Sequence, residues 1–358
     1  MKAPRSDNPD SAPIDPGPSR HAPGGPAPSG PTPSPPAHAR PTLVRGEGLH
    51  VWDADGRRYF DAISGAFCVQ LGYGRSDIAQ AMAAAAGRLP FARTAAFESE
   101  ESVAYARELL DQAGHPFVRV LFTSSGSEAV DVALKAALRY QAAAGRPKRT
   151  RVAHLRGHYH GATLAALWVG DYGPRRAPYE GLLGSHAVGP SAFCVRCFRG
   201  LTFPGCALAC AEAAIGAARA GAGGAAAEAA AVHAIEGDPS QGDVAALILE
   251  TIPAAGLGAP VPPPGYLARI RRECDARGAL WIADEVLTGF GRVGSLFAWQ
   301  RLGERPEDGR ACPDIVVFGK GAGAGYAAIG GILIAERVAR VLDSGPSGPF
   351  THAQTYGG

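Results

Sequence analysis

Two short apolar runs, Ala279-Leu-Trp-Ile-Ala-Asp-Glu285 and Ile315-Val-Val-Phe-Gly-Lys320, decide how this chain folds. Each run stops abruptly at polar or turn residues, as strands do in a parallel sheet whose two faces are both covered. In open α/β sheets the ligand crevice lies just beyond the carboxyl ends of such strands. Asp284 and Lys320 stand at two of these ends, so we predict that they share one site. A pyridine cofactor held by a lysine, with a carboxylate facing its ring nitrogen, requires this pair.

Size and charge narrow the class of protein. The chain has 358 residues and a formal net charge of +2, which is enough length for one large domain and a smaller one. No basic block, membrane-length apolar run or apolar signal core is present, so we expect no nucleic-acid partner, no membrane span and a cytoplasmic location. Seven cysteines in a chain of this length do not make a disulfide scaffold.

The N-terminal part divides into a tail and an ordered segment. Residues 1–41 are rich in Pro, Ser, Ala and Gly, which predicts a disordered tail. Beyond Leu43, an Asp55-Gly56 turn between two alternating runs predicts a hairpin. A glycine-punctuated loop over 64–74 and helices over 76–87 and 99–113 follow.

A serine- and glycine-rich loop follows the next predicted strand, Val118–Phe122. The loop Thr123-Ser-Ser-Gly-Ser127 leads into a helix over Glu128–Tyr140. Its backbone N–H groups and hydroxyls, together with the helix dipole, suit a phosphate. The alternative is an ordinary serine N-cap.

Three histidines cluster around the predicted strand Thr150–Leu155. His154, His158 and His160 could suggest a metal site, but their spacing matches no familiar zinc pattern and His154 lies inside the strand. Tyr159 at the strand end could stack on a flat cofactor or be a plain turn aromatic.

Four cysteines form a separate group. Cys194-Val-Arg-Cys197 and Cys206-Ala-Leu-Ala-Cys210 resemble four thiolates around a structural zinc or an iron–sulfur cluster. The alternative is a loop of reduced cysteines, because the second pair is unusually spaced and begins a helix.

The remaining elements complete an α/β pattern. Helical character is predicted over 207–231 and 266–278, and strands over 244–249 and 329–335. The strand over 244–249 ends at Glu250, a third polar residue at a strand end.

Taken together, these motifs resemble the class III (ω-amino) aminotransferases, a branch of the fold-type I pyridoxal-phosphate enzymes. The resemblance runs from about Leu43 to the last residue. Its most specific parts are Trp281–Gly294 and Pro313–Lys320, supported in the same order by Ser125–Ala129, Tyr159–Gly161 and Thr351–Gly357.

The resemblance implies a role for each matching residue. Lys320 would form the internal aldimine with pyridoxal 5'-phosphate, and Asp284 would pair with the pyridinium nitrogen. Val286 and Tyr159 would pack on the two ring faces. The remaining cofactor-binding positions are Ser125, Gly126, Ser127, His160, Glu250 and Thr355, the last acting in a neighbouring subunit of a homodimer.

The resemblance also implies an architecture and a reaction. The fold would be a mostly parallel large-domain sheet sandwiched by helices, over 96–345, with a partial small domain beginning at 42–95. Residues 346–358 would start an interface and phosphate loop, and the C-terminal small domain would be absent. The expected reaction moves an amino group from a primary amine or ω-amino acid to a 2-oxo acid. Alternatives are a lyase or decarboxylase on the same scaffold, or an inactive truncated fragment.

Overall fold

The computed structural model describes residues 40–94, 96–183, 187–215, 244–303, 311–345 and 348–357. Contacts divide the chain into Met1–Thr42 and Leu43–Gly358, and the helices and strands of the described residues lie in the second unit. The predicted tail, residues 1–41, falls almost entirely outside the described residues.

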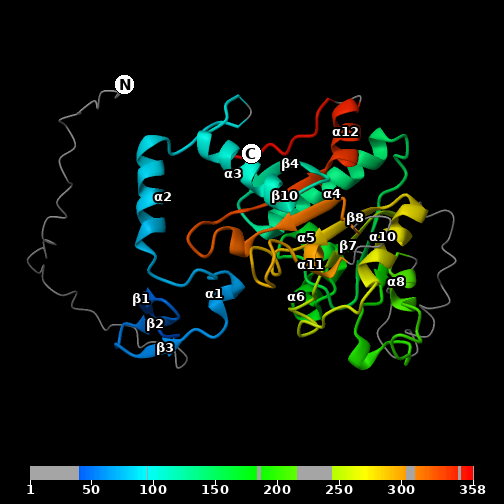
Figure 1. Cartoon of the computed structure of the whole chain (residues 1–358), viewed down its shortest axis with the longest axis horizontal. Helices are drawn as coiled ribbons and strands as arrows, with labels where there is room; N and C mark the ends of the chain where they lie inside the picture. The colour runs from blue at the N-terminus through cyan, green and yellow to red at the C-terminus, as the bar shows by residue number, and fades with distance from the viewer. Residues whose placement is uncertain are drawn as a thin grey trace, which may run out of the picture. The chain divides into compact units, whose positions relative to one another are not determined.

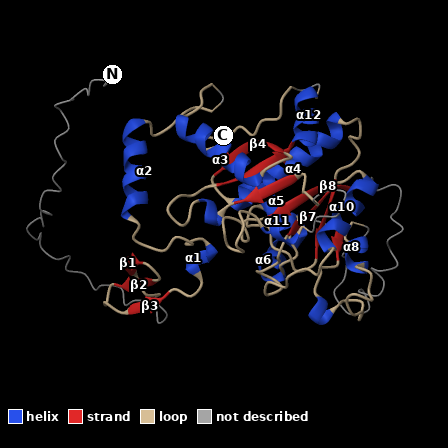
Figure 2. Ribbon diagram, viewed as in Figure 1, coloured by secondary structure: helices blue, strands red, loops and turns tan. Residues whose placement is uncertain are grey.

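A seven-stranded sheet forms the centre of this unit (Figure 2). The order of its strands is β4-β10-β9-β8-β7-β5-β6. The strands are β4 Phe117–Thr123, β5 Arg151–Leu155, β6 Ala187–Gly189, β7 Val244–Glu250, β8 Leu280–Asp284, β9 Ile315–Phe318 and β10 Gly330–Ala335. Strands β6, β5, β7, β8 and β9 pair in parallel, whereas β10 runs antiparallel to both β9 and β4. The mostly parallel α/β sheet predicted from the apolar runs is therefore confirmed.

The central strands bury both of their faces, which explains why their sequences are continuously apolar. In β8, Trp281 and Ala283 enter one core and Leu280 and Ile282 enter the other. The first core is completed by α3, α8, α10 and α11, and the second by α4, α5 and α12. Figure 1 shows α4 beside α12, and α8 beside α10, in agreement with their contacts. The sheet is thus sandwiched by helices, as predicted.

The longer helices agree closely with the sequence expectations. The helices are α1 Ser64–Phe67, α2 Ser76–Arg88, α3 Glu100–Ala113, α4 Gly126–Ala143, α5 Leu164–Trp168, α6 Gly173–Arg176, α7 Glu180–Leu183, α8 Ala209–Ala213, α10 Tyr266–Arg277, α11 Ala298–Leu302 and α12 Glu336–Ser344. Of the helical stretch predicted over 207–231, only α8 lies within the described residues. In the described part of the chain, no helix is long and apolar enough to cross a membrane.

A second, antiparallel sheet contains β1 Leu43–Glu47, β2 His50–Asp53 and β3 Arg58–Phe60. The β2–β3 pair is the predicted hairpin, and Gly56 in its turn has φ +79°, a conformation that favours glycine. The loop after β3 contacts the chain beyond Lys320, because the Tyr326 hydroxyl donates to the Gly72 carbonyl (2.9 Å).

Candidate active site

The carboxyl ends of three adjacent parallel strands bring the predicted polar residues together. Glu250 ends β7 and Asp284 ends β8, and the two are direct partners in the strand register. Asp284 is in turn the register partner of Val317 in β9, and Lys320 follows that strand after Gly319. Residues far apart in the sequence therefore share one edge of the sheet, where α/β folds place their ligands.

Asp284 is held in a fixed orientation. Only 4% of its surface is exposed, and its Oδ2 lies 2.7 Å from His160 Nδ1. Its Oδ1 accepts a hydrogen bond from the backbone N–H of Val286 at 3.0 Å. These contacts compensate for burial of the carboxylate and fix its direction before any ligand binds.

Lys320 occupies a strained backbone position. Its φ is +41°, in the left-handed region that non-glycine residues seldom adopt, and it begins a short 3-10 turn, Lys320–Ala322. Strain of this kind persists where the surrounding structure imposes it, and it clusters at functional sites. The side chain is half-buried, and no described residue forms a hydrogen bond or ion pair with its amine.

The beginning of α4 packs tightly against both of these strand ends. A Cβ built on Gly126 would lie 2.8 Å from Val286 Cγ1 and Cγ2, and one built on Gly319 would lie 3.1 Å from Gly126 Cα. A side chain at position 126 would force Val286 to move, because real Cβ contacts essentially never fall below 3.0 Å, and one at position 319 would make an unusually tight contact with the backbone of Gly126. The N-terminus of α4 is thereby fixed next to the residue after Asp284 and the residue before Lys320.

The α4 N-terminus is both a capped helix end and a candidate anion site. The Ser125 hydroxyl accepts from the Glu128 N–H at 3.2 Å, so the N-cap interpretation of this serine is confirmed. Helix geometry gives the N–H groups of Gly126 and Ser127 no intrahelical acceptor. Ser127 Oγ also accepts from the Ala162 N–H at 3.0 Å, which ties α4 to the loop after β5. The two interpretations of this loop, cap and phosphate site, are compatible.

Glu250 positions the loop that follows β5. Its Oε2 accepts from the Tyr159 N–H at 2.9 Å, and its own N–H donates to His158 Nδ1 at 2.9 Å. Burial raises the pKa of Glu250 to about 7, opposed by His160 and reinforced by the neighbouring Asp284 charge. Burial also lowers the pKa of His158 well below its usual value, so this imidazole is neutral and accepts the hydrogen bond. Glu250 thus contacts the backbone of Tyr159, whose side chain the family resemblance assigns to ring stacking.

Two of the three histidines contact the acidic residues at the strand ends. His154 is buried in β5, while His158 and His160 have ring centroids 6.0 Å apart and are used by Glu250 and Asp284. Among the described residues, no group of three or more His, Cys, Asp or Glu side chains that could hold a metal ion is found.

Thr355 lies in the described segment 348–357, which packs on this same chain. The Tyr356 carbonyl lies 3.5 Å from the Ser124 hydroxyl, and the Tyr356 ring packs edge-on against Phe91. This segment is therefore next to the loop that precedes α4. The expected role of Thr355 in a neighbouring subunit remains a prediction.

The structure adds Gln70, which the sequence does not single out as a site residue. A Cβ built on Gly321 would lie 2.1 Å from Gln70 Nε2, so this amide packs beside the residue after Lys320. Both amide atoms of Gln70 are buried without a partner among the described residues. Orphaned buried polar atoms next to a candidate site favour contact with a ligand or a water. The only signal in the sequence is the location of Gln70 in a glycine-rich loop.

The residues present fit a phosphorylated pyridine cofactor. Because Gly126 lets the start of the 18-residue helix α4 pack close to Val286, the backbone N–H groups at this helix end lie beside Asp284 and Lys320, where they can bind an anion. The oriented carboxylate of Asp284 can face a basic ring nitrogen, and the unpaired amine of Lys320 can reach an aldehyde from the adjacent strand end.

Comparison with known proteins identifies the family. The sequence profile of the family described as "Aminotransferase class-III" matches residues 34–358. A probable aminotransferase of Mycobacterium tuberculosis is 34% identical over 89% of this chain and 62% of its own length. A putrescine–pyruvate aminotransferase of Pseudomonas aeruginosa is 31% identical over 88% of this chain and 63% of its own length.

Solved structures agree. An amine transaminase from an uncultivated Pseudomonas species, in a PLP-bound form, superimposes with a TM-score of 0.74 at 32% identity, covering 92% of this chain and 70% of that one. A thermostable (S)-enantioselective omega-transaminase from Thermomicrobium roseum gives 0.72 at 33% identity, covering 89% and 65%. The chain spans less than two thirds of the length of the two curated relatives named above. The profile match and these similarities show that the chain belongs to the class III aminotransferase family.

Proposed function

We propose that this chain carries the active site of a pyridoxal-phosphate-dependent aminotransferase that moves an amino group from a primary amine or ω-amino acid to a 2-oxo acid. The observation that carries the proposal is the convergence of Lys320, Asp284 and the α4 N-terminus at one edge of the sheet. The names of the relatives, which include putrescine–pyruvate and acetylornithine aminotransferases, favour amino-group transfer over the lyase and decarboxylase alternatives.

Pyridoxal phosphate, when bound, supplies an aldehyde that condenses with amines and a ring that accepts electrons from the substrate carbon. Lys320 would hold the aldehyde and, once released, carry the proton at the substrate carbon. A lysine beside a cationic ring in a partly desolvated pocket can lose its proton near neutral pH.

Asp284 and the α4 N-terminus would hold the two ends of the cofactor. Asp284 would keep the ring nitrogen protonated, with His160 and the Val286 N–H fixing the carboxylate. The N–H groups of Gly126 and Ser127 and the hydroxyl groups of this loop would bind the phosphate. Val286 and Tyr159 would pack on the two ring faces. Glu250 would fix the backbone of Tyr159 by accepting a hydrogen bond from its N–H.

We infer further that the functional form is a cytoplasmic homodimer in which Thr355 reaches the phosphate of the neighbouring subunit. On this proposal, residues 96–345 form the cofactor-binding domain and residues 42–95 contribute to a smaller one. The packing of segment 348–357 beside the phosphate loop supports a role for this segment at the site.

Visible absorbance tests the proposed function most directly. Adding pyridoxal phosphate to the purified chain should produce the band of a lysine-bound cofactor, and an amine donor should bleach it. Lys320→Ala should abolish the band and lower activity by at least about 10³-fold, because it removes both the covalent attachment and the proton carrier. Lys148→Ala, at an exposed loop residue, is the matched control and should behave as the unchanged chain.

The reaction type is tested by stoichiometry. An aminotransferase consumes one 2-oxo acid for each amine, whereas a lyase or decarboxylase consumes none. A folded protein that forms no band with pyridoxal phosphate would contradict the proposed function altogether.

A further inference from the structure

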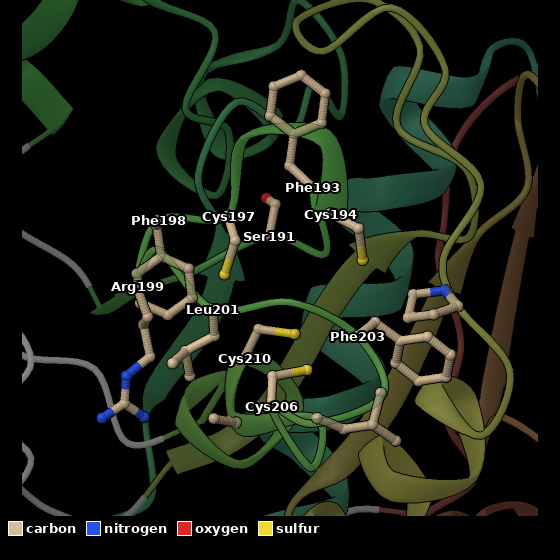
Figure 3. A pocket seen from close by; sticks show the side chains of 13 residues that line it. Ser191, Phe193, Cys194, Cys197, Phe198, Arg199, Leu201, Phe203, Cys206 and Cys210 are labelled. Carbon is tan, nitrogen blue, oxygen red and sulfur yellow. The ribbon is translucent and has the colours of Figure 1, made fainter.

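Four cysteines outside the candidate active site meet at one pocket. Cys194, Cys197, Cys206 and Cys210 all line a pocket walled by the aromatic rings of Phe193, Phe198 and Phe203. In Figure 3, Cys194 and Cys197 approach the space from one side and Cys206 and Cys210 from the other. All four are free thiols rather than disulfides. They are close enough to interact electrostatically, Cys194 with Cys197 and Cys206, and Cys210 with Cys194 and Cys206.

The backbone presents these cysteines in two tight turns. Cys194 begins a 3-10 turn, and the Cys197 carbonyl accepts from the Gly200 N–H at 2.9 Å. Ala207, Leu208 and Ala209 separate the second pair, and the first two of these have φ +48° and +59°. Two consecutive non-glycine residues in the left-handed region are unusual, and here they bring Cys206 and Cys210 to the same pocket.

A buried tyrosine provides an independent indication of a ligand. Tyr266, the first residue of α10, is 3% exposed, and its hydroxyl has no hydrogen-bond partner among the described residues. Three thiols lie within electrostatic range of this hydroxyl: Cys210 and Cys194 of the pocket, and the buried Cys274 outside it. A buried O–H without an acceptor is costly, and a metal-bound thiolate at Cys194 or Cys210 would provide that acceptor.

We propose that Cys194, Cys197, Cys206 and Cys210 together bind one Zn²⁺ ion, and that the Tyr266 hydroxyl donates a hydrogen bond to one of the bound thiolates. The first pair has the common C-x₂-C spacing, and the C-x₃-C spacing of the second pair, although less usual, still lies within the range found in structural zinc sites. Binding releases the thiol protons to solvent, and the dication offsets the mutual repulsion of the thiolates. As the side chains stand, no group of three or more His, Cys, Asp or Glu residues in the described part of the chain could hold a metal ion, so the proposal requires the four thiols to move toward one another when zinc binds.

The site would fix a segment that has little regular structure. Between β6 and α8 the described chain contains only turns and the short 3-10 helix Cys194–Arg196. This segment touches the loop after β5, because the Ser191 hydroxyl donates to the Arg156 carbonyl. Zinc would therefore stabilise the chain next to the loop that carries Tyr159 and His160, without joining the chemistry.

Metal analysis of the full chain tests the proposal without reference to activity. The chain, purified under reducing conditions without chelators, should contain one zinc per molecule. Replacement of zinc by Co²⁺ should give the visible spectrum of a tetrahedral cobalt thiolate. The absence of bound metal, or iron with acid-labile sulfide in place of zinc, would overturn the proposal.

Variants locate the metal. Cys194→Ser combined with Cys206→Ser should lose zinc, whereas Cys68→Ser, at a half-buried thiol outside the pocket, should retain it. Retention of one zinc by the double variant would place the metal elsewhere and overturn the assignment. If the double variant does not fold, the cobalt spectrum of the unchanged chain still shows whether thiolates bind the metal.

Tyr266→Phe tests the hydrogen bond to the thiolate. Removal of an outer-sphere donor should weaken zinc affinity by about tenfold and shift the cobalt–thiolate charge-transfer band. A packing role alone would lower thermal stability equally with and without metal and would leave that band unchanged.

Discussion

The strand-end site and the cysteine pocket differ in how far the protein alone completes them. At the strand ends, Asp284 already has His160 and the Val286 N–H as partners, and Glu250 has the Tyr159 N–H. At the cysteine pocket, Cys194 and Cys206 are free thiols, and the buried Tyr266 hydroxyl has no hydrogen-bond partner among the described residues. The first arrangement is preorganised for chemistry, and the second depends on a ligand to become complete.

This difference predicts two kinds of variant. Changes at the strand ends should alter activity or cofactor affinity while the fold persists, because the sheet beneath them is buried on both faces. Changes at the cysteine pocket should alter metal content and stability without altering the chemistry.

Asp284→Asn should have the largest effect. The amide can still accept from the Val286 N–H and contact His160, but it lacks the charge that keeps a ring nitrogen protonated. We expect kcat for transamination to fall by about 10²–10³-fold, as when other preorganised electrostatic contacts are removed. Thermal unfolding and zinc content should stay close to those of the unchanged chain.

Asp55→Asn, at an exposed turn residue, is the matched control for charge loss. Full activity in the Asp284→Asn variant would show that this carboxylate does not act on the cofactor. Loss of zinc or of the folded state would instead break the comparison, because the two sites would then not be independent.

Glu250→Gln should produce a pH-dependent change in stability. The pKa of Glu250 is raised to about 7 in the folded protein by burial, so the folded state holds this proton more tightly than the unfolded state does. Its contribution to the free energy of unfolding is therefore present at low pH and declines as pH rises from about 4.5 to about 7. The glutamine variant lacks this decline, so relative to the unchanged chain it should gain stability between pH 5 and pH 8, by at most about 3 kcal/mol.

Urea unfolding of the cofactor-free proteins at both pH values measures this gain. Glu98→Gln, at an exposed carboxylate, should show no such dependence. The same difference in stability at both pH values for Glu250→Gln would show that Glu250 is ionised throughout, and that its pKa is not raised.

Much of the fold can be predicted from the sequence because its central strands are buried on both faces. Burial makes β7, β8 and β9 continuously apolar, so the sequence predicts both the positions of these strands and the polar residues at their ends. α12 is not evident from the sequence, although its buried residues Val338 and Leu342 lie on one helical face, because the helix has only nine residues and begins directly after β10.

The contacts that complete the site could not be predicted, because they join distant segments through backbone geometry. His160 and Asp284 are 124 positions apart, and neither residue alone indicates the pair. The orphaned amide of Gln70 depends on how its loop folds back onto Gly321. Likewise, the two cysteine pairs can be recognised as motifs in the sequence, but the sequence does not indicate that the Tyr266 hydroxyl is buried within electrostatic range of them.

Gly126→Ala tests the smallest feature of the strand-end site, the close approach of α4 to Val286. The added Cβ would lie 2.8 Å from both Val286 methyl carbons, so α4 or Val286 must move. We expect a loss of about 1–3 kcal/mol in the free energy of unfolding, as for other overpacked positions, and weaker binding of pyridoxal phosphate because the N–H groups of the helix end are displaced. Denaturant unfolding and cofactor titration measure the two effects.

Two further variants separate this contact from a general intolerance of glycine replacement. Gly87→Ala, in α2 with open space around its Cα, should be neutral or stabilising by up to about 1 kcal/mol, because alanine favours a helix. Adding Val286→Ala to Gly126→Ala removes the clashing methyl groups and should restore cofactor binding in part. If the double variant binds pyridoxal phosphate no better than Gly126→Ala does, the position of the α4 N-terminus depends on its contact with the backbone of Gly319 rather than on the Val286 side chain. A Cβ built on Gly319 would lie 3.1 Å from Gly126 Cα.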